Sequence, residues 1–197
     1  MKKLSIATII AGAMIFSACN GNTNSTSASD STNTMSSADT GMNTMNNADT
    51  SKATVDQNAV DFAQEAATGG MMEVELGNLA QKNSSFKAVK DYGKMLADDH
   101  TSLNNELKDL ASKKNINLPT TVTSDQQDKI DKLSKETGSA FDKDFISMAI
   151  DDHEKDINNF KKAGDNLTDQ DLKDFIVKAL PTLQKHLDKA KEIKKKL

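Results

Sequence analysis

Four ionisable side chains fall inside otherwise apolar stripes of this sequence: Glu73, His100, His153 and His186. They include every histidine of the chain, and each lies near the middle of a predicted helix. Because an α-helix rises about 1.5 Å per residue, we expect the four side chains at a common height inside a helical bundle. Burying an imidazole or a carboxylate alone costs several kcal/mol, so four converging groups need a shared partner.

Three imidazoles and one carboxylate are the ligands of a tetrahedral zinc site, and the same set also suits iron, copper or manganese. We therefore predict one transition-metal ion held by these four residues. Asp99, Asp152 and Glu154 lie next to the histidines and are candidates for additional ligands or for hydrogen-bond acceptors behind them. The alternative is a metal-free polar layer in which an ionised Glu73 pairs with a protonated histidine.

Apolar residues spaced alternately by three and four positions define the faces that the predicted helices bury. The clearest stripe consists of Phe86, Val89, Gly93, Leu96, His100, Leu103, Leu107 and Leu110. Similar stripes surround Glu73, His153 and His186. The pattern predicts long helices that each turn one face toward a common core.

The predicted long helices cover about 56–82, 86–114, 138–163 and 168–197, with a shorter helical piece at 125–137. Gly164 is expected to end the third long helix, and Thr168 is expected to cap the last one. Pro181 removes a backbone hydrogen bond inside that last helix and predicts a kink.

The long connection between the second and third long helices leaves two topologies open. It either crosses the bundle from end to end, which makes these two helices parallel, or forms a loop and a short extra helix in an up-down bundle. The segment Met95–His100 parallels Met148–His153, so the two helices are expected to be equivalent members of two hairpins. The similar distances of His100 and His153 from their helix starts favour the crossover.

Residues 1–19 have the organisation of an export signal, with two lysines before an apolar run that is too short to span a bilayer. The end of this segment resembles the lipobox of bacterial lipoproteins, although Phe16 replaces the usual leucine. The resemblance implies that Cys19, the only cysteine, is lipidated and becomes the mature N-terminus. The alternative is an ordinary cleaved signal with an incidental cysteine.

Residues 20–55 consist mainly of Ser, Thr, Asn, Ala, Asp and Gly, which offer almost nothing to bury. We predict a disordered tether here, followed by a globular domain over 56–197. The lipid anchor predicts a location in the cell envelope. Because no acidic run follows Cys19, the sequence favours the outer membrane, facing the periplasm, and leaves the inner membrane and the cell surface as alternatives.

The composition limits the classes of partner and fold. A formal net charge of -4 and the absence of arginine argue against nucleic-acid binding. The expected partner is the membrane, which the N-terminal lipid would bind. Aromatic residues make up only 4% of the chain, and helix-forming residues are abundant. These features favour an all-α domain over a β-sandwich.

Four segments each contain one of the polar residues of the predicted helices: Glu73–Gly77, Met95–His100, Met148–His153 and Leu180–Leu187. Together they resemble an uncharacterised, ferritin-like domain family of bacterial envelope proteins, which are often labelled outer-membrane proteins. The resemblance implies a ferritin-like four-helix bundle over most of 56–197 and no settled activity. Ferritins bind two iron ions with Glu-x-x-His on two helices. Here Ala97, Ile150 and Leu183 stand three residues before the histidines, so a single metal ion is expected instead.

The expected function is therefore that of a membrane-tethered envelope lipoprotein whose bundle binds one metal ion. A structural or interaction lipoprotein without a ligand is the alternative. A ferritin-like redox enzyme is the third possibility. The sequence shows no nucleophile triad, phosphate-binding glycine loop or paired-carboxylate site, which favours a binding protein over an enzyme.

Overall fold

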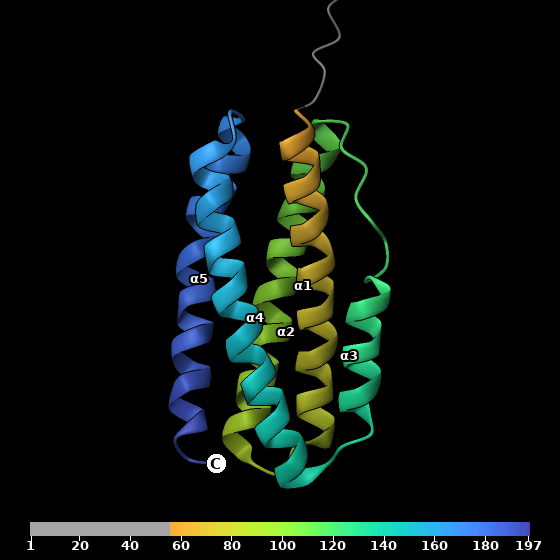
Figure 1. The fold of residues 1–197 in the computed structure, drawn as a ribbon, viewed down its shortest axis with the longest axis vertical. Coiled ribbons are helices and arrows are strands. Elements are labelled where there is room, and N and C mark those ends of the chain that lie inside the picture. The colour runs from red at the N-terminus through yellow and green to blue at the C-terminus, as the bar shows by residue number, and fades with distance from the viewer. Residues whose placement is uncertain (1–55) are drawn as a thin grey trace, which may run out of the picture. The chain divides into compact units, whose positions relative to one another are not determined.

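The computed structural model of the protein describes residues 56–197, which contain five α-helices and no strand (Figure 1). The helices are α1 (Gln57–Asn83), α2 (Lys87–Lys113), α3 (Ser124–Ser134), α4 (Gly138–Asn166) and α5 (Gln170–Lys194). The predicted all-α class is confirmed. The helix count is five rather than four because the segment expected to be a short helical piece forms α3, separate from α4.

Three predicted features lie outside the described residues: the export signal at 1–19, its lipidation site Cys19, and the tether at 20–55. Within 56–197, no helix is both long enough and apolar enough to cross a membrane.

Ion pairs between helices show how the long helices run. Lys178 of α5 binds Glu106 of α2 at 2.6 Å, and Lys185, further along α5, binds the earlier residue Asp99 at 3.1 Å. The two helices are therefore antiparallel. Since α4 and α5 form an antiparallel hairpin, α2 and α4 run parallel (Figure 1). The connection through α3 thus passes along the length of the bundle beside α1, as expected for the crossover topology.

Capping side chains set the starts of three helices. The carboxylates of Asp56 and Asp169 accept backbone N–H groups at the first turns of α1 and α5. Thr123 and Gln126 form a reciprocal capping box at α3. The predicted cap Thr168 is wrong by one residue, because Asp169 provides the oxygen that accepts the N–H of the first turn.

Two further expectations concerned residues that interrupt helices. Gly164 does not end α4, which continues to Asn166 and closes with Leu167, a residue only 3% exposed. Burying Leu167 in the core extends the helix past the glycine. Helix α5 stays helical on both sides of Pro181.

Helices α1 and α2 approach each other closely at a pair of glycines. A Cβ atom on Gly77 would lie 2.5 Å from the carbonyl oxygen of Gly93, and a Cβ on Gly93 would lie 2.5 Å from the Cβ of Ala80. Only glycine fits at this crossing, and the absence of side chains lets the two backbones touch. The contact fixes the relative height of the residues that α1 and α2 contribute to the core.

The apolar core consists of two clusters, which divide near His100 on α2. Leu96, one turn before His100, belongs to the cluster that contains Tyr92 and Phe145. Leu107, two turns after it, belongs to the cluster at the other end of the bundle. The predicted polar residues therefore lie where the two apolar clusters meet.

Candidate metal centre

The structure buries all four of the predicted polar residues in the bundle, one from each long helix. Glu73 of α1 is 1% exposed, His100 of α2 is 4% exposed, and His153 of α4 and His186 of α5 are fully buried. The three imidazole rings contact one another, with centroids 5.2 to 5.7 Å apart. The predicted burial of the four side chains is therefore confirmed.

The histidines bring three nitrogen atoms together, one per ring, all within 4.8 Å of one another. Nitrogen ligands of a tetrahedral ion with bonds of about 2.1 Å lie about 3.4 Å apart. The pair formed by His153 and His186 already has this spacing, with Nε2 and Nδ1 3.2 Å apart. Because no two of the three nitrogens are more than 4.8 Å apart, the His100 nitrogen has to come closer by at most about 1.4 Å to complete a three-nitrogen site of that size.

Hydrogen bonds at the outer side of two rings assign their protons. Nδ1 of His153 lies 2.8 Å from the carbonyl oxygen of Ala149, which can only accept, so Nδ1 carries the proton. Nε2 of His186 lies 2.9 Å from Oδ2 of Asp99 and donates to this carboxylate. Histidines that bind metals in proteins typically donate their other N–H to a carbonyl or a carboxylate in this way.

The assignment leaves the inner nitrogens of His153 and His186 without protons when the rings are neutral. Two lone pairs then face each other across 3.2 Å. Burial lowers the pKa of His153 to about 4, and burial also lowers the pKa of His186, although Asp99 opposes that shift. At neutral pH a proton is therefore a poor bridge between the two nitrogens, whereas a metal ion satisfies both.

His100 adds the third nitrogen. Its Nε2 is buried and has no hydrogen-bond partner. Burial lowers the pKa of His100 well below its ordinary value, and the neighbouring histidines lower it further if they are charged. A buried nitrogen without a partner is costly, and a bound ion would remove that cost.

Glu73 does not join the three nitrogens. Its Oε1 lies 3.9 Å from Nδ1 of His153, the nitrogen that already donates to Ala149, and both carboxyl oxygens lack a hydrogen-bond partner. Burial raises the pKa of Glu73 well above its ordinary value, and Asp152 and Asp156 raise it further. Glu73 therefore lies on the far side of His153 from the other two histidines. The sequence had predicted it as the fourth ligand of the metal.

The three acids predicted to lie next to the histidines, Asp99, Asp152 and Glu154, have different surroundings. Asp99 accepts from His186 and also binds Lys185 at 3.1 Å. Asp152 binds Lys129 of α3 at 2.9 Å, and its other oxygen is buried without a partner. Glu154 is exposed and pairs with Lys191 at 2.7 Å, so it faces away from the histidines. Of the three, only Asp99 has a hydrogen bond to one of the histidines.

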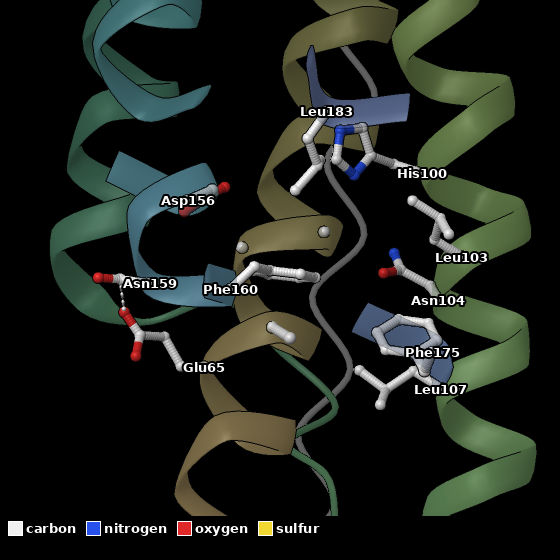
Figure 2. Close-up of a pocket in the computed structure, with 13 residues that line it drawn as sticks. Glu65, His100, Leu103, Asn104, Leu107, Asp156, Asn159, Phe160, Phe175 and Leu183 are labelled. Carbon is white, nitrogen blue, oxygen red and sulfur yellow. Dashed lines mark hydrogen bonds between the residues drawn. The ribbon is translucent and has the colours of Figure 1, made fainter. Parts of the chain in front are cut away.

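A small, partly open cavity lies beside His100 (Figure 2) and was not predicted. Asp156 and Asn104 line it, each less than two turns from a histidine on the same helix. Burial raises the pKa of Asp156 to about 6, and the negative charge of Asp152 contributes. The sequence offered one signal, since spacings of three and four place Asp156 and Asn104 on the same helix faces as His153 and His100.

The described part of the chain is thus an all-helical domain with a cluster of three histidines in its core. The sequence profile of a family described as a domain of unknown function, DUF4142, matches residues 44–193, and the chain belongs to this family. The expectation of an uncharacterised family is confirmed. No curated protein and no solved structure matches the chain.

Proposed function

We propose that this protein binds one transition-metal ion through His100, His153 and His186, inside a ferritin-like four-helix bundle formed by α1, α2, α4 and α5. The lipidated Cys19 would tether this domain in the cell envelope, through the segment 20–55. The proposal rests mainly on the facing nitrogens of His153 and His186, which lie 3.2 Å apart while their outer nitrogens are hydrogen-bonded.

The donor set narrows the choice of metal. The three ligand atoms are imidazole nitrogens, which suit zinc, copper and iron, whereas manganese prefers oxygen ligands. Glu73, the carboxylate predicted as the fourth ligand, lies behind His153. A centre with nitrogen donors alone favours zinc or copper among the four metals considered from the sequence.

The metal-free polar layer has less support. That alternative needs an ionised Glu73 beside a protonated histidine, and such a pair would lower the pKa of the acid and raise that of the imidazole. The shifts run in the opposite directions, since burial raises the pKa of Glu73 and lowers the pKa of His153. Both groups are favoured in their neutral forms, which leaves the histidine nitrogens free to bind a cation.

Elemental analysis of the full chain, purified without a histidine tag, tests the proposal. We expect about one zinc or copper ion per chain after equilibration with the metal and desalting. The variant His100→Leu/His186→Leu should hold less than a tenth of that amount while keeping its helical circular dichroism. Glu154→Gln is the matched control, because this exposed acid follows His153 directly and should leave the metal content unchanged. Equal metal content in all three proteins would refute the proposal.

A further inference from the structure

The cavity beside His100 measures about 30 Å³ and lies among α1, α2, α4 and α5. A water molecule needs roughly 10–15 Å³ on this measure, so the cavity has room for about two. His100 lines it, and so does Leu183, one turn before His186 on α5. Space for a small guest therefore adjoins the histidine centre.

Two consecutive glycines of α1 line this space, where Gly69 leaves room beside Asp156 and Gly70 leaves room for the Asn104 side chain. A Cβ atom on Gly69 would meet nothing closer than Oδ2 of Asp156 at 4.0 Å, so this glycine borders the space. A Cβ on Gly70 would lie only 2.0 Å from Oδ1 of Asn104. Glycine is the least favourable residue in a helix interior after proline, and these two positions in α1 lie at the cavity.

Asn104 lies between the cavity and two open grooves along α1 and α2. It lines all three, and Met71 and Thr120 border both grooves as well. Figure 2 shows the amide of Asn104 beside the cavity, below His100 on the same helix. A rotation of this one side chain would connect the grooves with the space beside His100.

The polar lining of the cavity favours one kind of guest. Leucine and phenylalanine side chains form part of the wall, and the acids Glu65 and Asp156 line it together with Asn104 and Asn159. Carboxylates accept hydrogen bonds and repel anions. The cavity therefore suits a neutral molecule that carries N–H or O–H groups over a small anion of the same size.

We propose that this cavity is the binding site of an exogenous fourth ligand of the metal, a neutral hydrogen-bond donor of one or two heavy atoms that enters past Asn104. Water is the ligand at rest. The inference rests on the proposed function, because three protein nitrogens around a tetrahedral ion leave one position open. It adds a second, exchangeable ligand site to the metal site.

The test uses the full chain loaded with Co²⁺, whose visible absorption bands report the ligands, and hydroxylamine as a neutral two-atom probe. We expect hydroxylamine to change the bands saturably and azide, an anion, to bind at least tenfold more weakly. Gly69→Val should weaken the binding of hydroxylamine about tenfold or more by filling the cavity. Gly69→Ala should weaken it less and raise Tm by a few degrees, because alanine favours the helix.

Gly164→Ala is the matched control, since it makes the same change in α4, where a Cβ would lie 3.4 Å from Ile176 in ordinary contact. It should leave the affinity for hydroxylamine unchanged. Asn104→Ala should accelerate both association and dissociation of the probe in stopped-flow measurements. A change in dissociation alone would overturn the entry route.

The outcomes separate this inference from the metal site itself. Failure of the chain to bind Co²⁺ would refute both the proposed function and the fourth ligand. Cobalt bands that do not change when hydroxylamine is added would refute only the proposed site of the fourth ligand. Equal probe affinity in the wild type and Gly69→Val, or binding of azide as tight as that of hydroxylamine, would also refute it.

Discussion

Nε2 of His153 and Nδ1 of His186 face each other at 3.2 Å, although the outer nitrogen of each ring already donates to an acceptor, at 2.8 and 2.9 Å. Neutral rings with these outer bonds direct two lone pairs at the same point. A cation at that point would convert the repulsion into two bonds. Metal binding, its dependence on pH and its dependence on Asp99 all follow from this relationship.

Removal of the metal should destabilise the protein. An ion that binds only the folded chain, at a free concentration of about 100 times Kd, adds about 2.7 kcal/mol to the free energy of unfolding. We therefore expect a chelator to lower Tm by several degrees in a calorimetric scan. The His100→Leu/His186→Leu variant should melt at the same temperature with and without the chelator. A wild type that is equally insensitive would contradict metal binding.

The carboxylate behind His186 should matter for affinity. Asp99→Ala removes the acceptor of the Nε2 proton, so the ring loses its fixed orientation and part of its basicity. Such losses typically reduce metal affinity about 10–100-fold, which isothermal titration calorimetry would measure. Asp98→Ala is the control, because this neighbouring acid pairs with Lys94 on the exposed face of α2. Equal losses in both variants would point to a general charge effect.

Metal affinity should fall only in acid. Protons compete with the metal for the histidine nitrogens, and burial lowers the pKa of His153 to about 4 from the ordinary 6.5. We expect the metal affinity to stay nearly constant from neutral pH down past 6.5, the ordinary pKa of histidine. Metal release should have its midpoint closer to pH 4, the lowered pKa of His153. Release followed by a chromogenic chelator across the pH range measures this. A midpoint near 6.5 would mean that the rings are not buried as described.

Asp156 should weaken the fold above its raised pKa. Its pKa is about 6 in the folded state against an ordinary value of 3.8, so the folded chain binds the extra proton between these values. The stability contributed by this group is present at low pH and is lost as pH rises from about 4 to about 6. Asp156→Asn should therefore raise the free energy of unfolding by on the order of 1–2 kcal/mol at neutral pH.

The same variant should be neutral below about pH 4, where both states of the wild type are protonated. Denaturant unfolding at both pH values gives the comparison. Asp151→Asn, an exposed acid on the same helix, should have little effect at either pH. An effect of Asp156→Asn that is equally large at low pH would rule out the titration as its cause.

The glycine crossing between α1 and α2 should tolerate no side chain. Gly93→Ala would place a Cβ atom 2.5 Å from the Cβ of Ala80 and 2.7 Å from the carbonyl oxygen of Gly77, so the helices must separate. Overpacking of this kind costs about 1–3 kcal/mol. Gly164→Ala makes the same change in α4 at an uncrowded position and should stabilise the chain slightly. Similar stabilities of the two variants in urea unfolding would contradict the close approach.

Helical periodicity was sufficient to predict that Glu73 and the three histidines are buried, because spacings of three and four determine which side of a helix a residue occupies. It did not predict the partners of these residues. Glu73 lies on the expected face of α1, yet the packing of α1 against α4 turns its carboxyl group behind His153. The direction of a side chain within a shared layer depends on helix rotations that a single sequence does not determine.

Contacts between residues far apart in the chain could not be predicted from the sequence either. Asp99 and His186 are 87 residues apart, and only the antiparallel pairing of α2 and α5 brings them together. Gly70 is unfavourable in the interior of α1, and its reason lies in the side chain of Asn104 on α2. The cap at Asp169 was missed by one residue and the end of α4 at Asn166 by three, because burial of Leu167 overrides local preference.

The most direct measurement of the central claim is the X-ray absorption fine structure of the full chain loaded with one zinc ion. The account predicts three imidazole nitrogens at about 2.0–2.1 Å, with the outer-shell scattering of histidine rings, and one light atom as the fourth ligand. In the His100→Leu/His186→Leu variant this signature should disappear together with the bound metal. A wild-type spectrum dominated by oxygen ligands, with fewer than two imidazoles at the zinc, would contradict it.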